Sequence, residues 1–100
     1  MGNLVDVEKV EPVIGEPTDS GKVFVGWKQW TQNTNGTWFS TETLNDARAV
    51  AKTEIAYNQE SPDVYSAVND WATESGLNAY EANLLAGVVW AEERRLSNRA

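Results

Sequence analysis

The feature that most constrains the fold is the stretch Gly26–Ser40, GWKQWTQNTNGTWFS, in which three tryptophans surround an Asn-Gly pair. The flanking residues 22–32 and 37–41 are rich in Val, Phe, Trp and Thr, as is typical of β-strands. Asn35 and Gly36 indicate a two-residue loop, because both central residues of a type I′ turn need positive φ. We therefore predict an antiparallel β-hairpin that turns at this pair.

This turn decides which side chains share a face of the hairpin. We expect Trp27 and Trp38 to form a cross-strand pair, against which the helices of the protein pack. The opposite face is expected to carry Phe24, Trp30, Gln32 and Phe39. Since a single layer of helices covers only one face of a two-stranded ribbon, the second aromatic face needs another cover. That cover is either the N-terminal segment or a partner molecule.

Residues 1–21 hold two of the three prolines and five of the acidic side chains. Pro12 and Pro17 exclude a continuous helix and favour extended backbone before each of them. The alternation in Val5–Glu8 is consistent with a short strand. We predict an extended arm, with room for one short edge strand, that packs on its own domain or on a neighbour. Its apolar side chains include Val5, Val7, Val10, Val13 and Ile14.

Helical periodicity begins after the hairpin. Thr43 is expected to be the N-cap of a first helix, which runs to about Asn58. Ser61 and Pro62 indicate a second start, with serine at the N-cap and proline at the first helical position. The second helix is expected to stop at Gly76 in a Schellman motif. Apolar residues recur at three- and four-residue spacing along both segments, so each is expected to bury one side.

A third helix is expected to begin at Asn78, with Glu81 completing a capping box. The second and third helices are therefore joined by a very short connection and form a helical hairpin. The sequence predicts an α+β fold in which this hairpin packs on one face of the sheet. In terms of domains, we expect an extended arm over residues 1–21 and a single hairpin-plus-three-helix domain over residues 22–100.

The composition excludes several kinds of chemistry. The chain has no His and no Cys, which removes the commonest general base, the commonest nucleophile and the usual zinc ligands. Its acid pairs, Glu42 with Asp46 and Glu92 with Glu93, are expected to serve helix electrostatics. The seven glycines are isolated, so no phosphate-binding loop is present. We expect a protein that is not an enzyme and that uses neither a cofactor nor a metal.

The net charge of −7 bears on the partners. Binding to a nucleic-acid backbone needs clustered cations, and here acids outnumber Lys and Arg by 15 to 8. No apolar run approaches the length of a membrane span, and the acidic first residues do not resemble a signal peptide. We therefore expect a protein partner, either a second copy or a larger assembly, with no direct nucleic-acid or membrane contact. The expected location is the cytoplasm, or the virion if a phage encodes the chain.

Three functions remain open. The first is a non-catalytic assembly component, of the structural or accessory kind that phages encode, which docks through its arm and its aromatic hairpin face. The second is a small acidic inhibitor that blocks a basic surface, as anti-defence proteins and nucleic-acid mimics do. The third is a carbohydrate-binding module in which Trp30 stacks on a sugar. For the first, the expected partner-binding residues are Trp30, Phe39, Phe24, Gln32, Val5, Val7, Val10, Val13 and Ile14.

Overall fold

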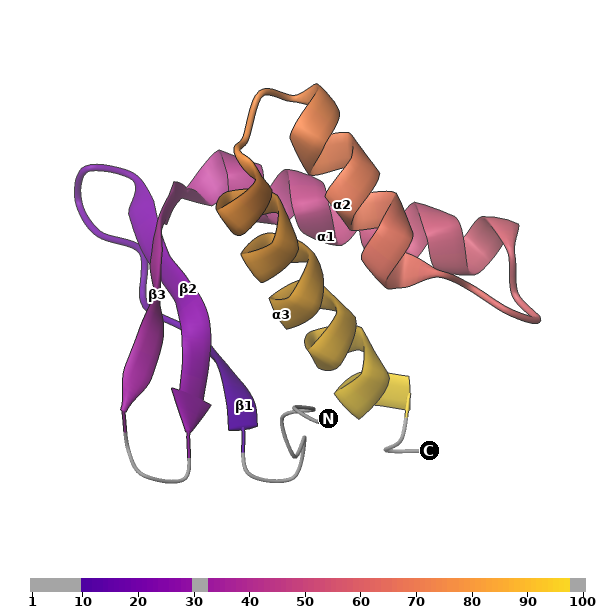
Figure 1. The fold of residues 1–100 in the computed structure, drawn as a ribbon, viewed down its shortest axis with the longest axis horizontal. Coiled ribbons are helices and arrows are strands. Elements are labelled where there is room, and N and C mark those ends of the chain that lie inside the picture. The colour runs from indigo at the N-terminus through magenta and orange to yellow at the C-terminus, as the bar shows by residue number, and fades with distance from the viewer. Residues whose placement is uncertain (1–9, 30–32, 98–100) are drawn as a thin grey trace.

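The computed structural model describes residues 10–29 and 33–97. Three strands are followed by three helices (Figure 1). The strands are β1 (Val10–Ile14), β2 (Lys22–Gln29) and β3 (Thr34–Ser40), and the helices are α1 (Thr41–Tyr57), α2 (Val64–Glu74) and α3 (Ala79–Ser97). The predicted α+β class is confirmed, with a short strand in the N-terminal segment and with α2 and α3 packed together as a helical hairpin.

The strands form one antiparallel sheet in the order β1-β2-β3, so β2 is the central strand. An edge strand is therefore present in the arm, as expected, over Val10–Ile14, and it pairs with Val25–Gln29 of β2. The alternation at Val5–Glu8 lies outside the described residues. Pro12 lies within β1, and a proline is tolerated there because an edge strand has one side without a hydrogen-bonding neighbour. This part of the arm thus belongs to the sheet of its own chain.

The predicted turn at Asn35 and Gly36 is wrong, because both residues lie inside β3. Gly26 is paired with Gly36, and the chain reverses after Gln29 and before Thr34. Among the described glycines, positive φ occurs only at Gly21 and Gly76. Position 36 therefore does not require glycine for the sake of a left-handed backbone conformation.

Close approach of the two strands explains the glycine instead. A Cβ atom built on Gly36 would lie 2.5 Å from the Cα of Gly26, and one on Gly26 would lie 2.7 Å from the Cα of Gly36. The backbone carbonyls of Val25 and Asn35 would lie closer still to these atoms. Neither position can carry a side chain unless the strands move apart, which is the usual meaning of a glycine inside a strand.

The observed register changes which aromatic side chains share a face. Phe39 pairs with Val23 and Trp38 pairs with Phe24, so Phe24 and Phe39 lie on opposite faces. Phe24 is on the face away from the helices, as expected, whereas the expected place of Phe39 on that face is wrong because its side chain belongs to the core. Trp27 alternates with Val25 and Val23 on the side of the helices, while Trp38 lies on the other side. The expected Trp27–Trp38 pair is consequently absent. Side chains alternate between the two faces along each strand, and in this register the two indoles point to opposite faces.

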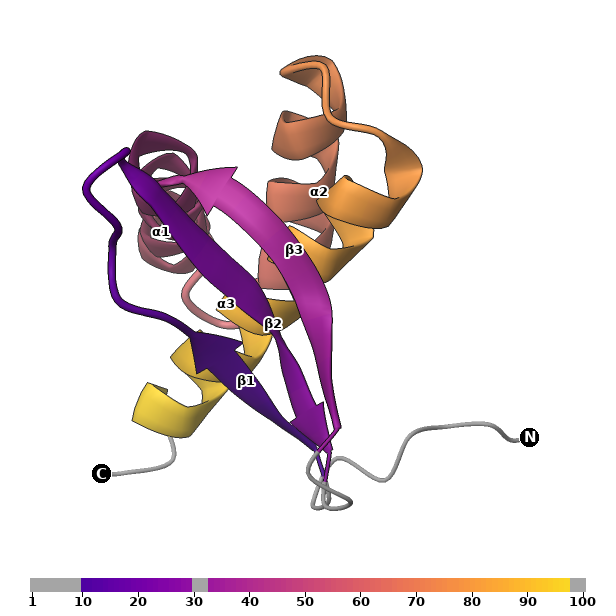
Figure 2. The same ribbon diagram turned by 90° about the vertical axis from the view of Figure 1, so that its left-hand side faces the viewer.

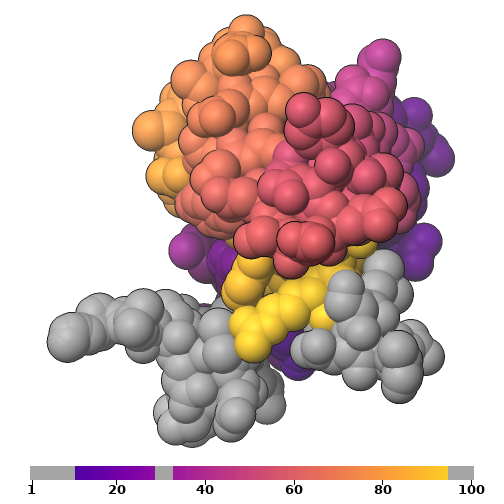
Figure 3. Space-filling model, turned by 90° about the vertical axis from the view of Figure 1, so that its right-hand side faces the viewer, coloured from indigo at the N-terminus to yellow at the C-terminus, as the bar shows by residue number. Residues whose placement is uncertain are grey.

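The helices lie on one side of the sheet. Figure 2 shows the strands in front, with α1 and α3 behind them. Both helices contact the sheet, and α2 packs against these two helices on the side away from the sheet. From the side opposite to the sheet, α2 and the end of α1 form the upper part of the surface, and part of α3 is visible below them (Figure 3). The described part of the molecule therefore has a sheet, two helices against it, and a third helix outside.

Helix α3 supplies the centre of the core. Every residue from Leu84 to Val89 is buried, so this part of the helix is enclosed on all sides. Gly87 lets the ring of Trp27 come close, since a Cβ here would lie 3.1 Å from its Cζ2 atom. The buried core comprises Val23, Val25, Phe39, Leu44, Ala47, Ala51, Val64, Val68, Ala72, Ala82, Leu84, Leu85, Ala86, Val88 and Val89.

Two helix starts differ from those expected. The N-cap of α1 is Ser40, whose hydroxyl accepts a hydrogen bond from the Thr43 N–H at 3.0 Å. The N-cap of α2 is Asp63, whose carboxylate accepts one from Ser66 N–H at 3.1 Å. Thr43 therefore lies in the first turn, and Ser61 precedes the helix. In both places several residues in a row can act as caps, and the sequence does not rank them.

The α2–α3 connection is as expected. Gly76 has a φ of 102°, and the Leu77 N–H donates to the Ala72 carbonyl at 3.1 Å, as a Schellman motif requires. Asn78 and Glu81 then form a reciprocal capping box, in which each backbone N–H donates to the other side chain. This tight connection places α3 antiparallel to α2 and directs it across the sheet.

Candidate functional site

The outer face of the sheet, on the side without helices, carries an aromatic pair. The rings of Phe24 and Trp38 meet edge to face, with centroids 5.7 Å apart and an angle of 75° between their planes. Trp38 keeps 54% of its surface exposed, and Phe24 is half-buried beneath it. An exposed indole held by a second ring is a rigid apolar surface, of the kind that protein interfaces use.

The surroundings of this pair are flat. In the next row of the sheet, Val13 lies beside Gly26 and Gly36. The two glycines have no side chain, and Gly26 is buried while Gly36 and Val13 are half-buried. We call Val13, Phe24, Gly26, Gly36 and Trp38 the outer-face patch.

Charged side chains border the outer-face patch. Lys28 and Glu11 are paired across β2 and β1 at one end, and Lys22 lies at the other end of β2. All three are exposed. The border thus has two cations and one anion, on a chain whose net charge is −7. A partner for this face needs apolar groups at its centre and carboxylates as well as a cation at its edge.

The residues expected to bind a partner fall into three groups. Phe24 and Val13 lie in the outer-face patch, and Val10 begins β1 opposite Gln29. Ile14 is on the side of the helices, where it packs against the core. Phe39 is 6% exposed and belongs to the core, so it offers no surface to a partner. The remaining expected residues lie outside the described part of the chain: Trp30, Gln32, Val5 and Val7.

Trp38 is the surface residue that sequence reasoning assigned to the core. The error follows from the register, because moving the turn away from Asn35-Gly36 exchanges the faces of Trp38 and Phe39. The facing glycines could have indicated the true register. Gly26 and Gly36 are the only two glycines within the two main strands, and close backbone approach favours placing them opposite each other.

Three of the four acids in the expected pairs, Glu42, Glu92 and Glu93, have a role in the fold. Glu92 accepts two hydrogen bonds from the Arg48 guanidinium, at 3.2 and 3.1 Å, and Glu93 lies 3.6 Å from the Lys52 ammonium. These bridges connect α1 to α3. Glu42 lies in the first turn of α1, where a negative charge interacts favourably with the helix dipole. Each of these carboxylates therefore has a role in the fold.

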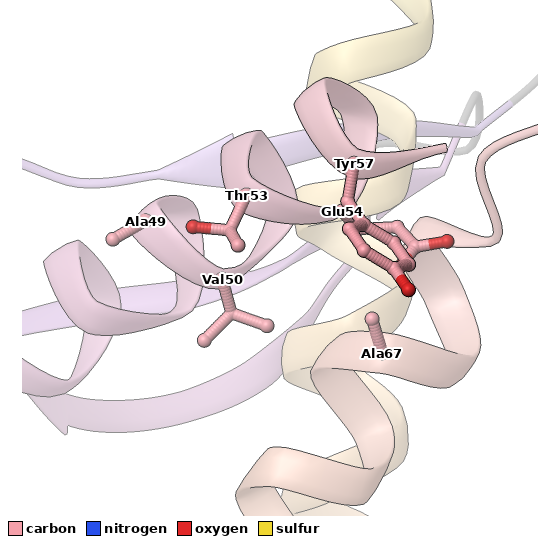
Figure 4. A pocket seen from close by; sticks show the side chains of 6 residues that line it. All are labelled: Ala49, Val50, Thr53, Glu54, Tyr57 and Ala67. Carbon is pink, nitrogen blue, oxygen red and sulfur yellow. The ribbon is translucent and has the colours of Figure 1, made fainter. Parts of the chain in front are cut away.

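A second surface feature lies between α1 and α2. It is an open groove of about 340 Å³, lined by Ala49, Val50, Thr53, Glu54, Tyr57 and Ala67. Five of these residues come from α1, and Ala67 faces them from α2 (Figure 4). Tyr57, in the last turn of α1, is 89% exposed. The groove is mainly apolar, and its polar groups are the Glu54 carboxylate and the hydroxyls of Thr53 and Tyr57.

Metal-binding clusters and membrane-spanning helices are both absent from residues 10–29 and 33–97. In these ranges no cluster of three or more acidic side chains could hold a metal ion. No helix there combines the length and hydrophobicity that crossing a bilayer requires. Comparison of the chain with protein-family models, with curated proteins and with solved structures gives no match.

Proposed function

We propose that this protein is a non-catalytic assembly component that docks another protein on the outer-face patch of its sheet. The observation that supports this most is the exposure of Trp38, 54% of whose surface is accessible while it rests on Phe24. An isolated monomer gains stability by burying an indole, and this fold places its helices on the opposite face. Contiguous exposed apolar groups on such a face are typical of interaction sites.

The two edge strands of the sheet, β1 and β3, differ in how readily they could pair with a strand of a partner, and β3, which carries Trp38, is the more suitable one. β1 carries Pro12 and the exposed Glu11, both of which oppose the addition of a further strand. β3 has neither, because the sequence Thr34–Ser40 contains no proline and no charged residue. A docked protein can therefore extend beyond Trp38 and contact the backbone of β3. This edge adds hydrogen bonds to a contact that is otherwise apolar.

The test compares two aromatic side chains of equal exposure. Trp38 is 54% exposed and lies on the sheet, whereas Tyr80 is 52% exposed and lies on α3. A photoreactive benzophenone amino acid is placed at each position, and the protein is irradiated in the cells that make it and as a purified sample. We expect a covalent adduct with one discrete protein, or with a second copy, from position 38 and none from position 80.

The same pair serves for a measurement of affinity. We expect Trp38→Ala to weaken the association by more than about tenfold, because truncated interface tryptophans are often hot spots. Its free energy of unfolding should fall by only about 1–2 kcal/mol, mainly because the variant loses the edge-to-face contact with Phe24. Tyr80→Ala should change neither quantity. The proposal is wrong if position 38 yields no adduct and sedimentation finds the purified protein monomeric at every concentration.

A further inference from the structure

The groove between α1 and α2 lies in a region without positive charge. From residue 53 to residue 93 the sequence has eight acidic side chains and neither Lys nor Arg. Asp63, the N-cap of α2, and Asp70 within α2 stand one turn before and after Ala67, and both are exposed. On α1, the exposed Asp46 stands one turn before Val50. Acidic side chains therefore flank the apolar floor on both walls of the groove.

The cations of α1 do not compensate for these acids. Arg48 and Lys52 are bonded to Glu92 and Glu93 of α3. Each is two residues from Val50, which places it about 200° around the helix. The lysine and the arginine thus face α3, on the far side of α1 from the groove. A negative potential remains over the groove, and fixed charges of one sign around a concave surface attract the opposite sign.

The apolar floor and the acidic walls together specify the ligand. We propose that the α1–α2 groove binds a basic amphipathic helix of a partner protein. Its apolar residues enter between Val50, Tyr57 and Ala67, and its Lys and Arg side chains reach Asp46, Asp63 and Asp70. Helices bind open grooves in this way, through apolar residues spaced three and four apart. The groove is separate from the outer-face patch, since the sheet and α2 lie on opposite sides of α3 (Figure 1).

Tyr57 is the most exposed aromatic side chain in the described part of the chain, and it lines the groove. Its ring is 89% exposed at the end of α1, beside the open groove (Figure 4). An aromatic side chain in this position loses little conformational entropy on binding and can pack along a docked helix. Glu54, in contrast, already accepts a hydrogen bond from the Asp63 N–H at 3.0 Å, which fixes the wall of the groove.

The probe is a fluorescein-labelled synthetic peptide of about 18 residues, with leucines every three or four positions and lysines elsewhere. Two control peptides have the same length. One replaces the lysines with glutamates, and the other keeps the composition but removes the leucine periodicity. Anisotropy measured against the full chain should show saturable binding of the first peptide alone. This binding should weaken as the salt concentration rises, because exposed charges are screened.

Matched variants locate the site. Thr53 lines the groove and Thr73 does not, and both are exposed residues of helices. We expect Thr53→Lys to weaken peptide binding by about tenfold or more, because it adds a cation and bulk to the groove. Thr73→Lys should change it by less than about twofold. Tyr57→Ala and Tyr80→Ala form a second pair with the same expected contrast. Circular dichroism confirms that each variant is folded.

Several results would overturn the proposal. One is the absence of binding, and a second is equal binding of the peptide without leucine periodicity, which indicates attraction to net charge alone. A third is binding that Thr53→Lys and Tyr57→Ala leave unchanged. The last is self-association of the wild-type protein that Thr53→Lys abolishes, since the occupant is then a second copy. None of these results depends on the outer-face patch, whose test uses Trp38.

Discussion

Replacing Gly36 tests the register of the sheet directly. A Cβ at this position would lie 2.5 Å from the Cα of Gly26, and still closer to the carbonyl oxygen of Val25. Non-bonded carbon atoms have their optimal separation at about 3.5–4.0 Å, so the added methyl group overlaps by about 1 Å. The obstructing atoms belong to the backbone, which cannot rotate away as a side chain can. The Gly36→Ala variant must therefore separate β2 from β3.

The cost follows from this separation. Overpacking costs about 1–3 kcal/mol, and each hydrogen bond weakened beside the pair costs about 1 kcal/mol more. We expect Gly36→Ala to lower the free energy of unfolding by about 3–5 kcal/mol. A chain of this size has a total stability of about 5–15 kcal/mol, so much of it is lost. The assay is urea unfolding followed by tryptophan fluorescence, and the melting temperature should fall by more than about 10 °C.

Two further variants distinguish the two explanations for glycine at position 36, which are close approach of the strands and a type I′ turn. Gly15→Ala adds its methyl 3.5 Å from the Cβ of Phe24, which is an ordinary contact, so its stability should stay within about 1 kcal/mol of wild type. Gly36→Asn is the decisive variant, because asparagine tolerates the positive φ of a type I′ turn but brings the same Cβ into the strand. If Gly36→Asn is as stable as the wild-type protein, the register described above is wrong.

The remaining predictions concern the helices. Arg48→Met should lower the free energy of unfolding by less than about 1 kcal/mol, because both partners of its bridge to Glu92 are about a third exposed. Urea unfolding in low and in high salt checks this, and a cost that persists in high salt would argue against an ionic cause. Asn78→Ala should cost about 1 kcal/mol by removing the side chain that accepts the Glu81 N–H at 2.8 Å. Hydrogen exchange at that amide should accelerate, and unchanged protection would mean that the cap is dispensable.

The sequence is most informative where one residue has one physical role. Gly76 ends α2 because its φ of 102° suits glycine alone, and Asn78 with Glu81 begins α3 through contacts within a single turn. Such local features were predicted correctly. Pro12 likewise excluded a helix and favoured extended backbone, and it lies in β1 at the edge of the sheet. In each case the deciding atoms are a few residues apart in the chain.

The register and the site depend on distant atoms. Gly36 fits both a turn and a close approach, and only the position of Gly26 on the other strand decides between them. The exposure of Trp38 and the burial of Phe39 follow from that one pairing. The α1–α2 groove was not predicted, because it depends on the angle at which two helices meet. The absence of Lys and Arg between residues 53 and 93 was visible in the sequence. Which surface lacks positive charge could be identified only once the positions of the helices were known.

The enclosure of α3 has a consequence for the synthesis of the protein. Residues 84–89 fill the space between the sheet and the other two helices, yet they follow all of those elements in the chain. A ribosome therefore releases three strands and two helices before the segment that joins them has emerged. Until then their apolar sides have no common partner, and interrupted chains are exposed to aggregation and to proteases. The native core is therefore completed only after residues 84–89 have left the exit tunnel.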